Sequence, residues 1–342
     1  MSNNTSAEIS PTLAFRAVVR RIEERGAGLR RLVLGGEDLA HLGLIGLDGE
    51  QEGEYLDLRF KLLVPTGGAT VDSVADALAW LRPSARPTPE QVDGWYREWL
   101  TVPEASRGAM RTYTMRWVRE EEGERRAAVD LVLHGVGPDG VPGAGCGPAA
   151  AFAAGARVGD EIVLLAPNRA LTGPDYGGID FRPGVATHVL LAADETAAPA
   201  LCNILSALPR SMRGHALIEV PEAGQVQDVD APEGIDVQWL VRTPEQTHGD
   251  VLAPALEEAA LAWIDACPTA TSLRRGEEPE DVDVDAGILW ETGTEVTGEG
   301  YAWIAGEAGM VKGLRRHLVR DLGVDRKRIA FMGYWRTGRA EG

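Results

Sequence analysis

One change of pattern along the chain limits the possible folds more than any other feature. Before residue 168, short stretches of alternating apolar and polar residues follow one another through turns, with one long interruption of helical spacing. After residue 183, apolar strand-like runs alternate with helical segments. Consecutive alternating strands favour an antiparallel sheet, whereas alternation of strand and helix indicates a parallel sheet covered by helices. The Gly- and Pro-rich stretch 168–183 is typical of a linker, so we expect two domains.

The first domain, expected at residues 10–178, has the pattern of a small antiparallel barrel. Two alternating stretches around the turn Glu-Glu-Arg-Gly-Ala-Gly predict a hairpin that opens the sheet. Residues 67–105 depart from the strand pattern and predict a helical insertion, with helices at 71–81 and around 95–99. The predicted strands are 13–22, 29–34, 54–63, the stretch around 111–116, 127–134 and 161–166, with a short helix at 149–156.

The second domain, expected at residues 184–342, alternates strands and helices, which predicts a parallel-sheet α/β domain. The run 274–286 is rich in Glu and Asp, and we expect an acidic loop there. The predicted strands are 188–193, 215–220, 236–240, 301–305 and 328–333, and the predicted helices are 198–208, 251–266 and 310–322. The fold class is therefore α+β with two domains, an antiparallel barrel followed by an α/β domain.

Composition narrows the possible partners and compartment. The chain has 342 residues, 44% of them hydrophobic, which is ample for two cores. Apolar runs are too short to cross a bilayer, and the polar N-terminus is unlike a signal peptide, so we expect a cytoplasmic protein. The formal net charge of −18 repels nucleic acid and anionic membranes. We expect neither as a partner and take a monomer as the default state.

Cysteine and histidine spacing excludes the common metal-based redox centres. Cys146, Cys202 and Cys267 lie far apart without a C-x-x-C pair, so this chain alone cannot supply a Cys₄ iron–sulfur cluster. The six histidines show no metal-site spacing. Any redox chemistry must therefore come from a bound organic cofactor.

The run Arg-Thr-Tyr-Thr-Met-Arg at 111–116 suits a flat, anionic cofactor. On a strand, Arg111, Tyr113 and Met115 share one face, whereas Thr112, Thr114 and Arg116 share the other. An aromatic ring can cover a planar ligand, and arginine can hold a phosphate through two hydrogen bonds. Flavin adenine dinucleotide has both features. The alternative is an ordinary half-exposed strand with cross-strand pairs.

A second segment, at His134-Gly135 and Gly147-Pro148-Ala149, flanks a loop that ends where a helix begins. Free N–H groups and the positive end of the dipole make helix N-termini good pyrophosphate sites. An ordinary turn is the alternative. The flavin interpretation becomes stronger because the motif at 111–116 precedes it.

A third motif, Asp194-Glu195-Thr196, lies between an apolar strand and a helix in the parallel domain. Ligands of open parallel sheets bind at the carboxyl ends of the strands. The acids are candidates for nicotinamide binding, with simple helix capping as an equal alternative. The Gly-rich dinucleotide fingerprint is absent, so the residues do not distinguish NADH from NADPH.

The C-terminal motif follows a predicted strand and contains Tyr334, Trp335 and Arg336. Trp335 is a candidate to close over a flavin ring, and Arg336 is a candidate to hold an anionic substrate. The alternative is a C-terminal strand docked by aromatic packing. Two arginine-rich stretches, 107–126 and 312–339, read mainly as solvated surface, with a few residues available for an anion site.

Taken in this order, the motifs resemble the siderophore-interacting protein family, FAD-dependent ferric-siderophore reductases within the ferredoxin-reductase-like superfamily. The resemblance runs from about Phe15 to Gly338. Its specific stretches are 111–116, 133–135 with 147–149, 193–200, 301–307 and 333–338.

The resemblance implies FAD bound noncovalently by the barrel and a nicotinamide-type α/β domain behind it. It places Tyr113 against the flavin ring and Arg111 on the phosphates. The further implied contacts are Thr114, His134, Gly135, Gly147 and Ala149 for the flavin, with Thr112 in the same motif, and Asp194, Glu195 and Thr196 for the nicotinamide. Two departures lie in the flavin loop, which is long and carries Ala150 and Phe152 where the family has Ser and Trp.

The implied activity is reduction of ferric iron in a siderophore, which releases Fe(II) because hard oxygen chelators hold ferrous iron weakly. The cofactor carries this chemistry, so no catalytic acid or base is required. Arg336, with Lys312 or Arg116, is expected to hold the anionic chelate. NADH, NADPH and reduced ferredoxin all stay open as donors. The alternatives are a generic flavin or quinone reductase and a non-catalytic ferric-siderophore-binding flavoprotein.

Overall fold

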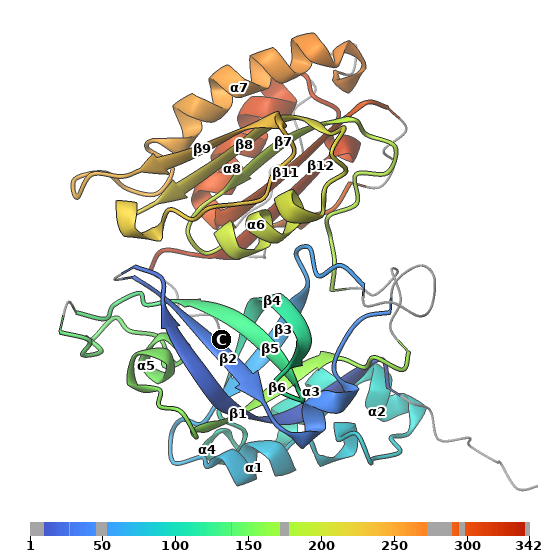
Figure 1. Ribbon diagram of the computed structural model, residues 1–342, viewed down its shortest axis with the longest axis vertical. Helices are drawn as coiled ribbons and strands as arrows, with labels where there is room; N and C mark the ends of the chain where they lie inside the picture. The colour runs from blue at the N-terminus through green and yellow to red at the C-terminus, as the bar shows by residue number, and fades with distance from the viewer. Residues whose placement is uncertain are drawn as a thin grey trace, which may run out of the picture. The chain divides into compact units, whose positions relative to one another are not determined.

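The computed structural model describes residues 10–26, 28–45, 53–137, 139–171, 178–271, 289–293 and 298–338. The chain divides into two compact units after Gly178, and Figure 1 shows both. Each unit is described by itself. The acidic loop predicted at 274–286 lies outside the described residues.

The first unit is a closed six-stranded barrel, which confirms the predicted antiparallel barrel. Its strand order is β1-β2-β5-β4-β3-β6, and β1 closes the barrel by pairing with β6. All of its strand pairs are antiparallel. The strands are β1 (Thr12–Glu24), β2 (Leu29–Gly35), β3 (Arg59–Val64), β4 (Ala109–Glu121), β5 (Glu124–Val132) and β6 (Glu161–Pro167). Closure leaves the sheet without an unpaired edge.

The insertion between β3 and β4 is helical, as predicted, and covers the outside of the barrel (Figure 1). Val74, Leu78 and Trp99 pack there against Leu63 and Met110 of the barrel strands. The helical elements are α1 (Val71–Asp76), η2 (Ala79–Leu81), α2 (Pro89–Asp93), α3 (Trp95–Thr101) and α4 (Glu104–Arg107). Burying this apolar surface stabilises the insertion on the barrel.

The predicted strand 54–63 was wrong at its start. The chain turns before β3, because the Leu58 N–H donates to the Tyr55 carbonyl at 2.6 Å and Leu56 has a φ of 39°. A leucine in the left-handed region is uncommon, and nothing in the local sequence signals it. The strand therefore begins only at Arg59.

The second unit is a six-stranded sheet of order β10-β12-β11-β7-β8-β9. Every pair is parallel except β10 with β12, so the sheet is mixed at one edge. Its strands are β7 (His188–Ala193), β8 (Arg213–Val220), β9 (Gly234–Val241), β10 (Trp290–Glu291), β11 (Gly300–Glu307) and β12 (Ile329–Trp335). The parallel sheet is confirmed, and the short strand β10 was not predicted.

Helices cover both faces of this sheet (Figure 1). Helices α7 (Leu252–Ala266) and α8 (Ala308–Arg316) bury residues in one core with β7, β8, β11 and β12, whereas α6 (Ala198–Ala207) covers the other face. The remaining short helical turns of the two units are η1 (Glu37–His41), α5 (Pro148–Gly155), η3 (Ala223–Gln225), η4 (Pro268–Ala270), η5 (His317–Asp321) and η6 (Arg326–Arg328). Strands sandwiched in this way are apolar on both faces, as the runs at 189–193 and 301–305 are.

Two boundaries in the second unit differ from the predictions. The last strand continues to Trp335, so Tyr334 and Trp335 belong to β12 and do not follow it. Helix α8 ends at Arg316, and the wider turn η5 follows, in which the Leu322 N–H donates to the His317 carbonyl at 3.0 Å. Within the described residues, no helix is long and apolar enough to span a bilayer.

Candidate functional site

The predicted flavin motif lies on β4, between β3 and β5. Arg111 and Tyr113 are half-buried, two residues apart, and so share a side of the strand. The Arg111 guanidinium donates to the main-chain oxygen of Met110 at 2.8 Å. A cation and an aromatic ring that both reach the surface at this spacing suit an anionic, planar ligand.

The two threonines of the motif are engaged more deeply. Lys61 Nζ on β3 donates to Oγ1 of Thr112 at 2.7 Å. Thr114 is 6% exposed and lies opposite Arg59 of β3. These residues tie β4 to its neighbour, and their contact with a flavin stays a prediction.

Arg116 departs from the predicted alternation because β4 carries a bulge there. Met115 lies opposite Val129 and Trp117 opposite Ala128, so Arg116 is the extra residue. Its Nε lies 3.3 Å from Oδ2 of Asp130, a fully buried carboxylate. The same carboxylate accepts two hydrogen bonds from Arg31, at 2.6 and 2.8 Å. Arg116 thus compensates a buried charge in the barrel, and its role toward a substrate stays a prediction.

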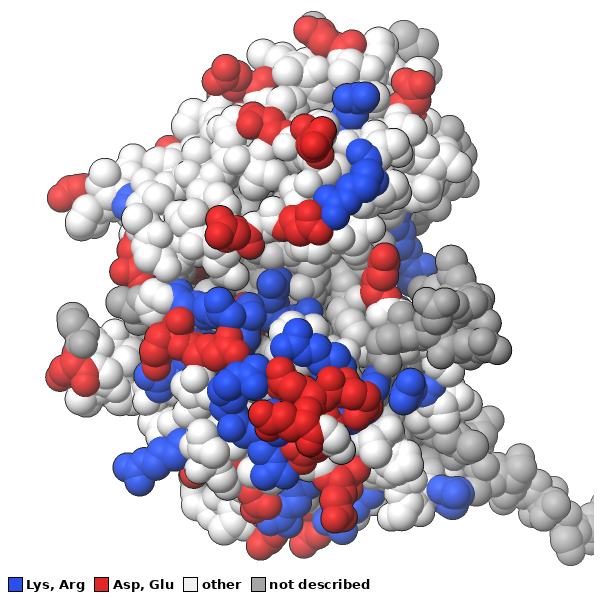
Figure 2. Space-filling view, viewed as in Figure 1, with Lys and Arg blue, Asp and Glu red and all other residues white. Residues whose placement is uncertain are grey.

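Most arginines around the bulge are also paired. Figure 2 shows Lys and Arg interspersed with Asp and Glu on the visible face of the barrel unit. For example, the Glu121 carboxylate forms ion pairs with three arginines, Arg21, Arg119 and Arg126. This mixed surface is a network of ion pairs, as expected for a solvated basic stretch.

The second flavin segment is a loop whose two ends are held together by the main chain. The Gly143 N–H donates to the Gly135 carbonyl at 2.7 Å, and the Cys146 N–H donates to Gly143 at 3.0 Å. Gly135 has a φ of 73°, and a Cβ there would lie 2.7 Å from the Cys146 nitrogen. Only glycine fits this approach. The closed loop therefore fixes the positions of His134 and Gly147, which lie at its two ends.

Gly147 is the N-cap of α5, and no side chain among the described residues caps this helix. A Cβ on Gly147 would meet nothing within 4 Å. Ala149 in the first turn is 2% exposed. At the other end, Arg30 Nη1 donates to the carbonyls of Ala153 and Ala154, each at 2.7 Å. The positive end of α5 is thus open to an anion, which fits the pyrophosphate of FAD.

In the α/β unit, Asp194 is fully buried directly after β7 and acts as a hydrogen-bond hub. Its Oδ1 accepts from the N–H groups of Thr196 and Ala197 at 2.9 and 3.2 Å and from the Thr196 hydroxyl. Its Oδ2 accepts from the Glu307 N–H and the Trp335 Nε1, each at 2.8 Å. Of the two interpretations left open by the sequence, these bonds show capping, in the turn that leads into α6.

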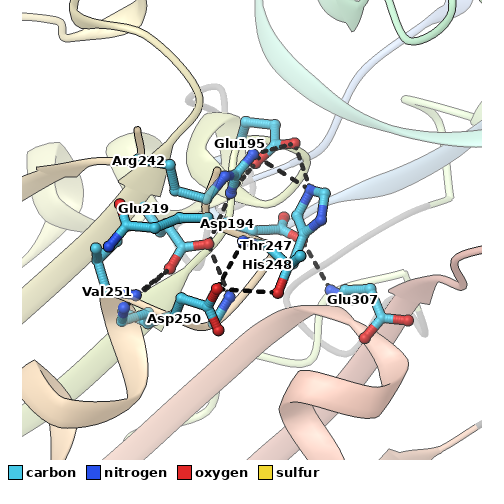
Figure 3. A network of polar contacts seen from close by, with 12 residues as sticks. Asp194, Glu195, Glu219, Arg242, Thr247, His248, Asp250, Val251 and Glu307 are labelled. Carbon is cyan, nitrogen blue, oxygen red and sulfur yellow. Dashed lines mark hydrogen bonds and ion pairs between the residues drawn. The ribbon is translucent and has the colours of Figure 1, made fainter. Parts of the chain in front are cut away.

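Glu195 belongs to a buried ion cluster at the same edge of the sheet (Figure 3). Arg242, directly after β9, donates to both Glu195 oxygens at 3.1 and 3.2 Å and to Glu219 at 2.6 Å. His248 Nε2 lies 2.9 Å from Glu195. Glu219 on β8 also accepts from the N–H groups of Gly249 and Leu252 at 2.8 and 2.9 Å, at the start of α7.

Hydrogen bonds and ion pairs within this cluster determine the protonation of its members. Burial alone would raise the pKa of Glu195, but hydrogen bonds from His248 and Arg242 lower it to about 2. Burial alone would lower the pKa of His248, but its bond to Glu195 raises it. Burial and the adjoining Glu195 raise the pKa of Asp194 to about 6, against the bonds from Thr196 and Trp335. Glu195 is therefore an ionised partner, and His248 binds a proton more readily than a free histidine does.

Glu307 caps α8, the third helix that begins at this edge of the sheet. Its Oε2 accepts from the Met310 N–H at 2.8 Å in α8, and its Oε1 accepts from the Thr337 N–H at 3.2 Å. Trp335 therefore lies between two anchored segments. Its ring also contacts the His248 ring edge to face, with centroids 4.6 Å apart at 77°.

The structure brings Asp194, Glu195 and Thr196, which the sequence assigned to the nicotinamide side, together with Trp335, which it assigned to the flavin ring, and both roles stay predictions. Arg336, next to Trp335, and Lys312 on α8 are half-buried, and their substrate role stays a prediction. The sequence analysis missed Glu219, Arg242 and His248. The signal for Glu219 was present, since a glutamate in the apolar run Ala-Leu-Ile-Glu-Val needs a buried partner.

The part of the chain that the structure describes contains no group of three or more His, Cys, Asp or Glu side chains placed to hold a metal ion. A closed antiparallel barrel followed by a helix-covered, mostly parallel sheet is a fold that the chain shares with a ferredoxin NADP+ reductase from Neisseria gonorrhoeae, with a TM-score of 0.51 and 12% identity over 94% of this chain and 99% of that one.

Comparison with known proteins narrows this class. A family model described as "Siderophore-interacting FAD-binding domain" matches residues 18–171, and one described as "Siderophore-interacting protein" matches residues 186–338. An uncharacterized protein of Mycobacterium tuberculosis is 30% identical over 97% of this chain and 92% of its own length. The chain belongs to the siderophore-interacting protein family.

Two further relatives have described roles or structures. The ferric vibriobactin reductase ViuB of Vibrio cholerae is 26% identical over 92% of this chain and 86% of its own length. The crystal structure of the siderophore-interacting protein SipS from Aeromonas hydrophila matches with a TM-score of 0.58 and 25% identity, over 96% of this chain and 94% of that one.

Proposed function

We propose that the protein is an FAD-dependent reductase that reduces ferric iron held in a siderophore and releases Fe(II) in the cytoplasm. The observation that carries the proposal is the open N-terminus of α5, within the segment that matches the FAD-binding domain of the family. The relationship to a ferric vibriobactin reductase supports the acceptor.

In the barrel unit, we assign binding and orientation to the motif residues. Arg111 holds phosphate and Tyr113 lies against the flavin ring, since both side chains are partly exposed on β4. Gly147 and the first turn of α5 receive the pyrophosphate. The remaining residues that we assign to flavin binding are Thr112, Thr114, His134, Gly135 and Ala149.

In the α/β unit, the carboxyl edge of the sheet receives the nicotinamide donor. Asp194 and Glu195 are 0% and 2% exposed, so they hold the edge in shape from within. Thr196 and Trp335 are the partly exposed members of the group. FAD held by these residues would supply hydride acceptance and one-electron transfer to ferric iron, which side chains alone do not provide.

The anionic chelate is held by cations. Arg336 and Lys312 are the candidates in the α/β unit, and Arg116 is the candidate in the barrel unit. Of these, Arg116 has part of its charge compensated by Asp130. Cationic groups that reach the surface also raise the rate of association with an anionic substrate.

An anaerobic absorbance experiment tests the function. The purified protein is loaded with FAD, mixed with NADH or NADPH, and then given a ferric siderophore with a ferrous trap. Bleaching of the flavin bands followed by their recovery as Fe(II) accumulates is the expected result, and it identifies the donor. Equal turnover with quinone and free flavin would point to a generic reductase. Flavin that neither nicotinamide nor reduced ferredoxin can bleach would overturn catalysis and leave a binding protein.

A further inference from the structure

Trp335 is held from two sides by groups that are themselves anchored. Its Nε1 donates to Asp194 at 2.8 Å, and its ring contacts His248 at a centroid distance of 4.6 Å. The structure gives the same indole two restraints in different directions. A tryptophan at the end of an edge-proximal strand would otherwise sample several rotamers.

Asp194 lies in the interior, and His248, whose side chain is 24% exposed, is bonded to buried groups. Asp194 is fully buried, and its other bonds fix it to the turn before α6 and to the Glu307 N–H. His248 is bonded to Glu195, which is 2% exposed and paired with Arg242 (Figure 3). The two restraints on Trp335 thus come from different strands of the sheet, through β7 and through the loop after β9.

We propose that Asp194 and His248 are positioning residues that act through Trp335, and that the Trp335 ring is the contact of the α/β unit with the nicotinamide ring. The proposal rests on the proposed function and deepens it. Trp335 and His248 are both partly exposed, whereas Asp194 is fully buried, so Asp194 can act on a ligand only through the groups that it bonds, and the Trp335 indole is the aromatic group among them. An electron-rich indole face is attractive to the cationic ring of an oxidised nicotinamide.

The requirement for an aspartate follows from the donors around it. Four N–H groups and one hydroxyl point at the two oxygens of Asp194. An asparagine has one acceptor oxygen, so its amide group would face N–H donors on one side. Oδ1 of Asp194 caps the turn before α6, so we expect the asparagine to keep its oxygen there and to place its amide group where Oδ2 was. Asp194→Asn should therefore release the bond from Trp335 Nε1.

The first readout is structural and needs neither cofactor nor substrate. In protein labelled with ¹⁵N at its indoles, the Trp335 signal is identified by its absence in Trp335→Phe. We expect this signal to shift and to exchange faster with water in Asp194→Asn. An unmoved signal in a folded Asp194→Asn variant would overturn the positioning role.

The second readout is the affinity for NAD⁺ or NADP⁺, measured by calorimetry on the full-length protein loaded with FAD. Removal of one charge-assisted hydrogen bond should weaken binding about tenfold in Asp194→Asn and in Trp335→Phe. Since both act through one ring, the double variant should be no weaker than the worse single variant. Additive losses would show that Asp194 acts by another route, and no binding of either dinucleotide to the unaltered protein would overturn the contact.

Two matched controls come from the same unit. Trp290→Phe removes an indole-to-carboxylate bond of the same kind, from Trp290 Nε1 to Asp180 at 3.2 Å. Asp250→Asn changes an exposed acid in the His248 loop that accepts hydrogen bonds from the N–H and the hydroxyl of Thr247. Both should leave nicotinamide affinity unchanged. His248→Gln should shift the Trp335 signal and weaken binding less than Asp194→Asn does.

The outcomes separate this inference from the proposed function. Loss of nicotinamide affinity in the variants, with no reduction of ferric siderophore by the unaltered protein, would retain the positioning role and reject the reductase. If Asp194→Asn and Trp335→Phe still reduce ferric siderophore and bind nicotinamide as tightly as the unaltered protein, the positioning role is rejected and the reductase is retained.

Discussion

Helix α5 of the barrel unit and the three long helices of the α/β unit begin in opposite ways. In the barrel unit, α5 begins at Gly147 without a side-chain cap. In the α/β unit, buried carboxylates serve the starts of all three long helices: Asp194 the turn before α6, Glu219 the start of α7 and Glu307 the start of α8. One unit leaves a positive helix end available, and the other neutralises each with an acid of its own.

This difference in capping indicates which helix N-termini are able to bind phosphate. An N-terminus whose N–H groups already face a carboxylate offers little to a pyrophosphate, because the donors are used and the charge repels. This agrees with the missing Gly-rich fingerprint in the α/β unit. We infer that its ligand is held chiefly through the aromatic edge at Trp335, whereas the barrel unit uses main-chain N–H groups.

The largest effect is expected from removing an internal cap. Glu219→Ala leaves the buried Arg242 without one partner and frees the N–H groups at the start of α7. Breaking such a buried pair should lower the free energy of unfolding by about 3–5 kcal/mol. Chemical denaturation measures this, with the exposed Glu258→Ala on α7 as control. Equal losses in the two variants would contradict the role of the cap.

The next prediction gives α5 the cap that it lacks. Gly147 has extended backbone angles, and a Cβ there meets nothing, so Gly147→Asp should fit. The new carboxylate should stabilise the FAD-free protein by about 0.5 kcal/mol. It should also raise the FAD dissociation constant roughly tenfold by occupying the anion site.

Flavin fluorescence titration checks this second prediction. Gly147→Ala is the matched control, since it adds the Cβ without the charge, and FAD affinity should hardly change. If Gly147→Asp binds FAD as tightly as the unaltered protein, the pyrophosphate is not at α5 and the comparison between the units fails.

The smallest effect concerns His248 and pH. Its pKa is raised in the folded protein by Glu195, so its stabilisation is complete below the unfolded pKa of about 6.5 and is lost as pH rises through the folded pKa. His248→Gln should therefore cost more stability at about pH 5.5 than at about pH 8.5. In a Glu195→Gln background the difference should vanish, and a pH-independent cost in the original background would contradict the assignment.

Periodicity alone predicted much of the fold. Alternation gave the barrel strands, and the apolar runs around Leu190 and Ile304 gave the parallel sheet. The turn at Leu56 was not predicted because no glycine stands at the position with positive φ. The bulge at Arg116 was not predicted because it depends on pairing with Val129, which the residues of the strand itself do not specify.

The candidate site was predicted only in part. Asp194 and Trp335 were singled out by their motifs, but their direct bond joins residues 141 positions apart. Arg242 and His248 were missed because the sheet order places β9 next to β8 and β8 next to β7. That order decides which strand ends meet, and it follows from packing between distant segments.

The closure of the flavin loop at Gly135 has a consequence for how the family can vary. The bond from the Gly143 N–H to the Gly135 carbonyl closes the base of the loop, and the outer turn is held by its own bonds, from the Gly137 N–H to the Val141 carbonyl and from the Gly140 N–H to the Gly137 carbonyl, each at 2.9 Å. We therefore expect a change of length in the outer turn to disturb those two bonds and to leave His134 and Gly147 in place. A peptide tag inserted after Gly140 should accordingly label the protein without moving the ends of the loop.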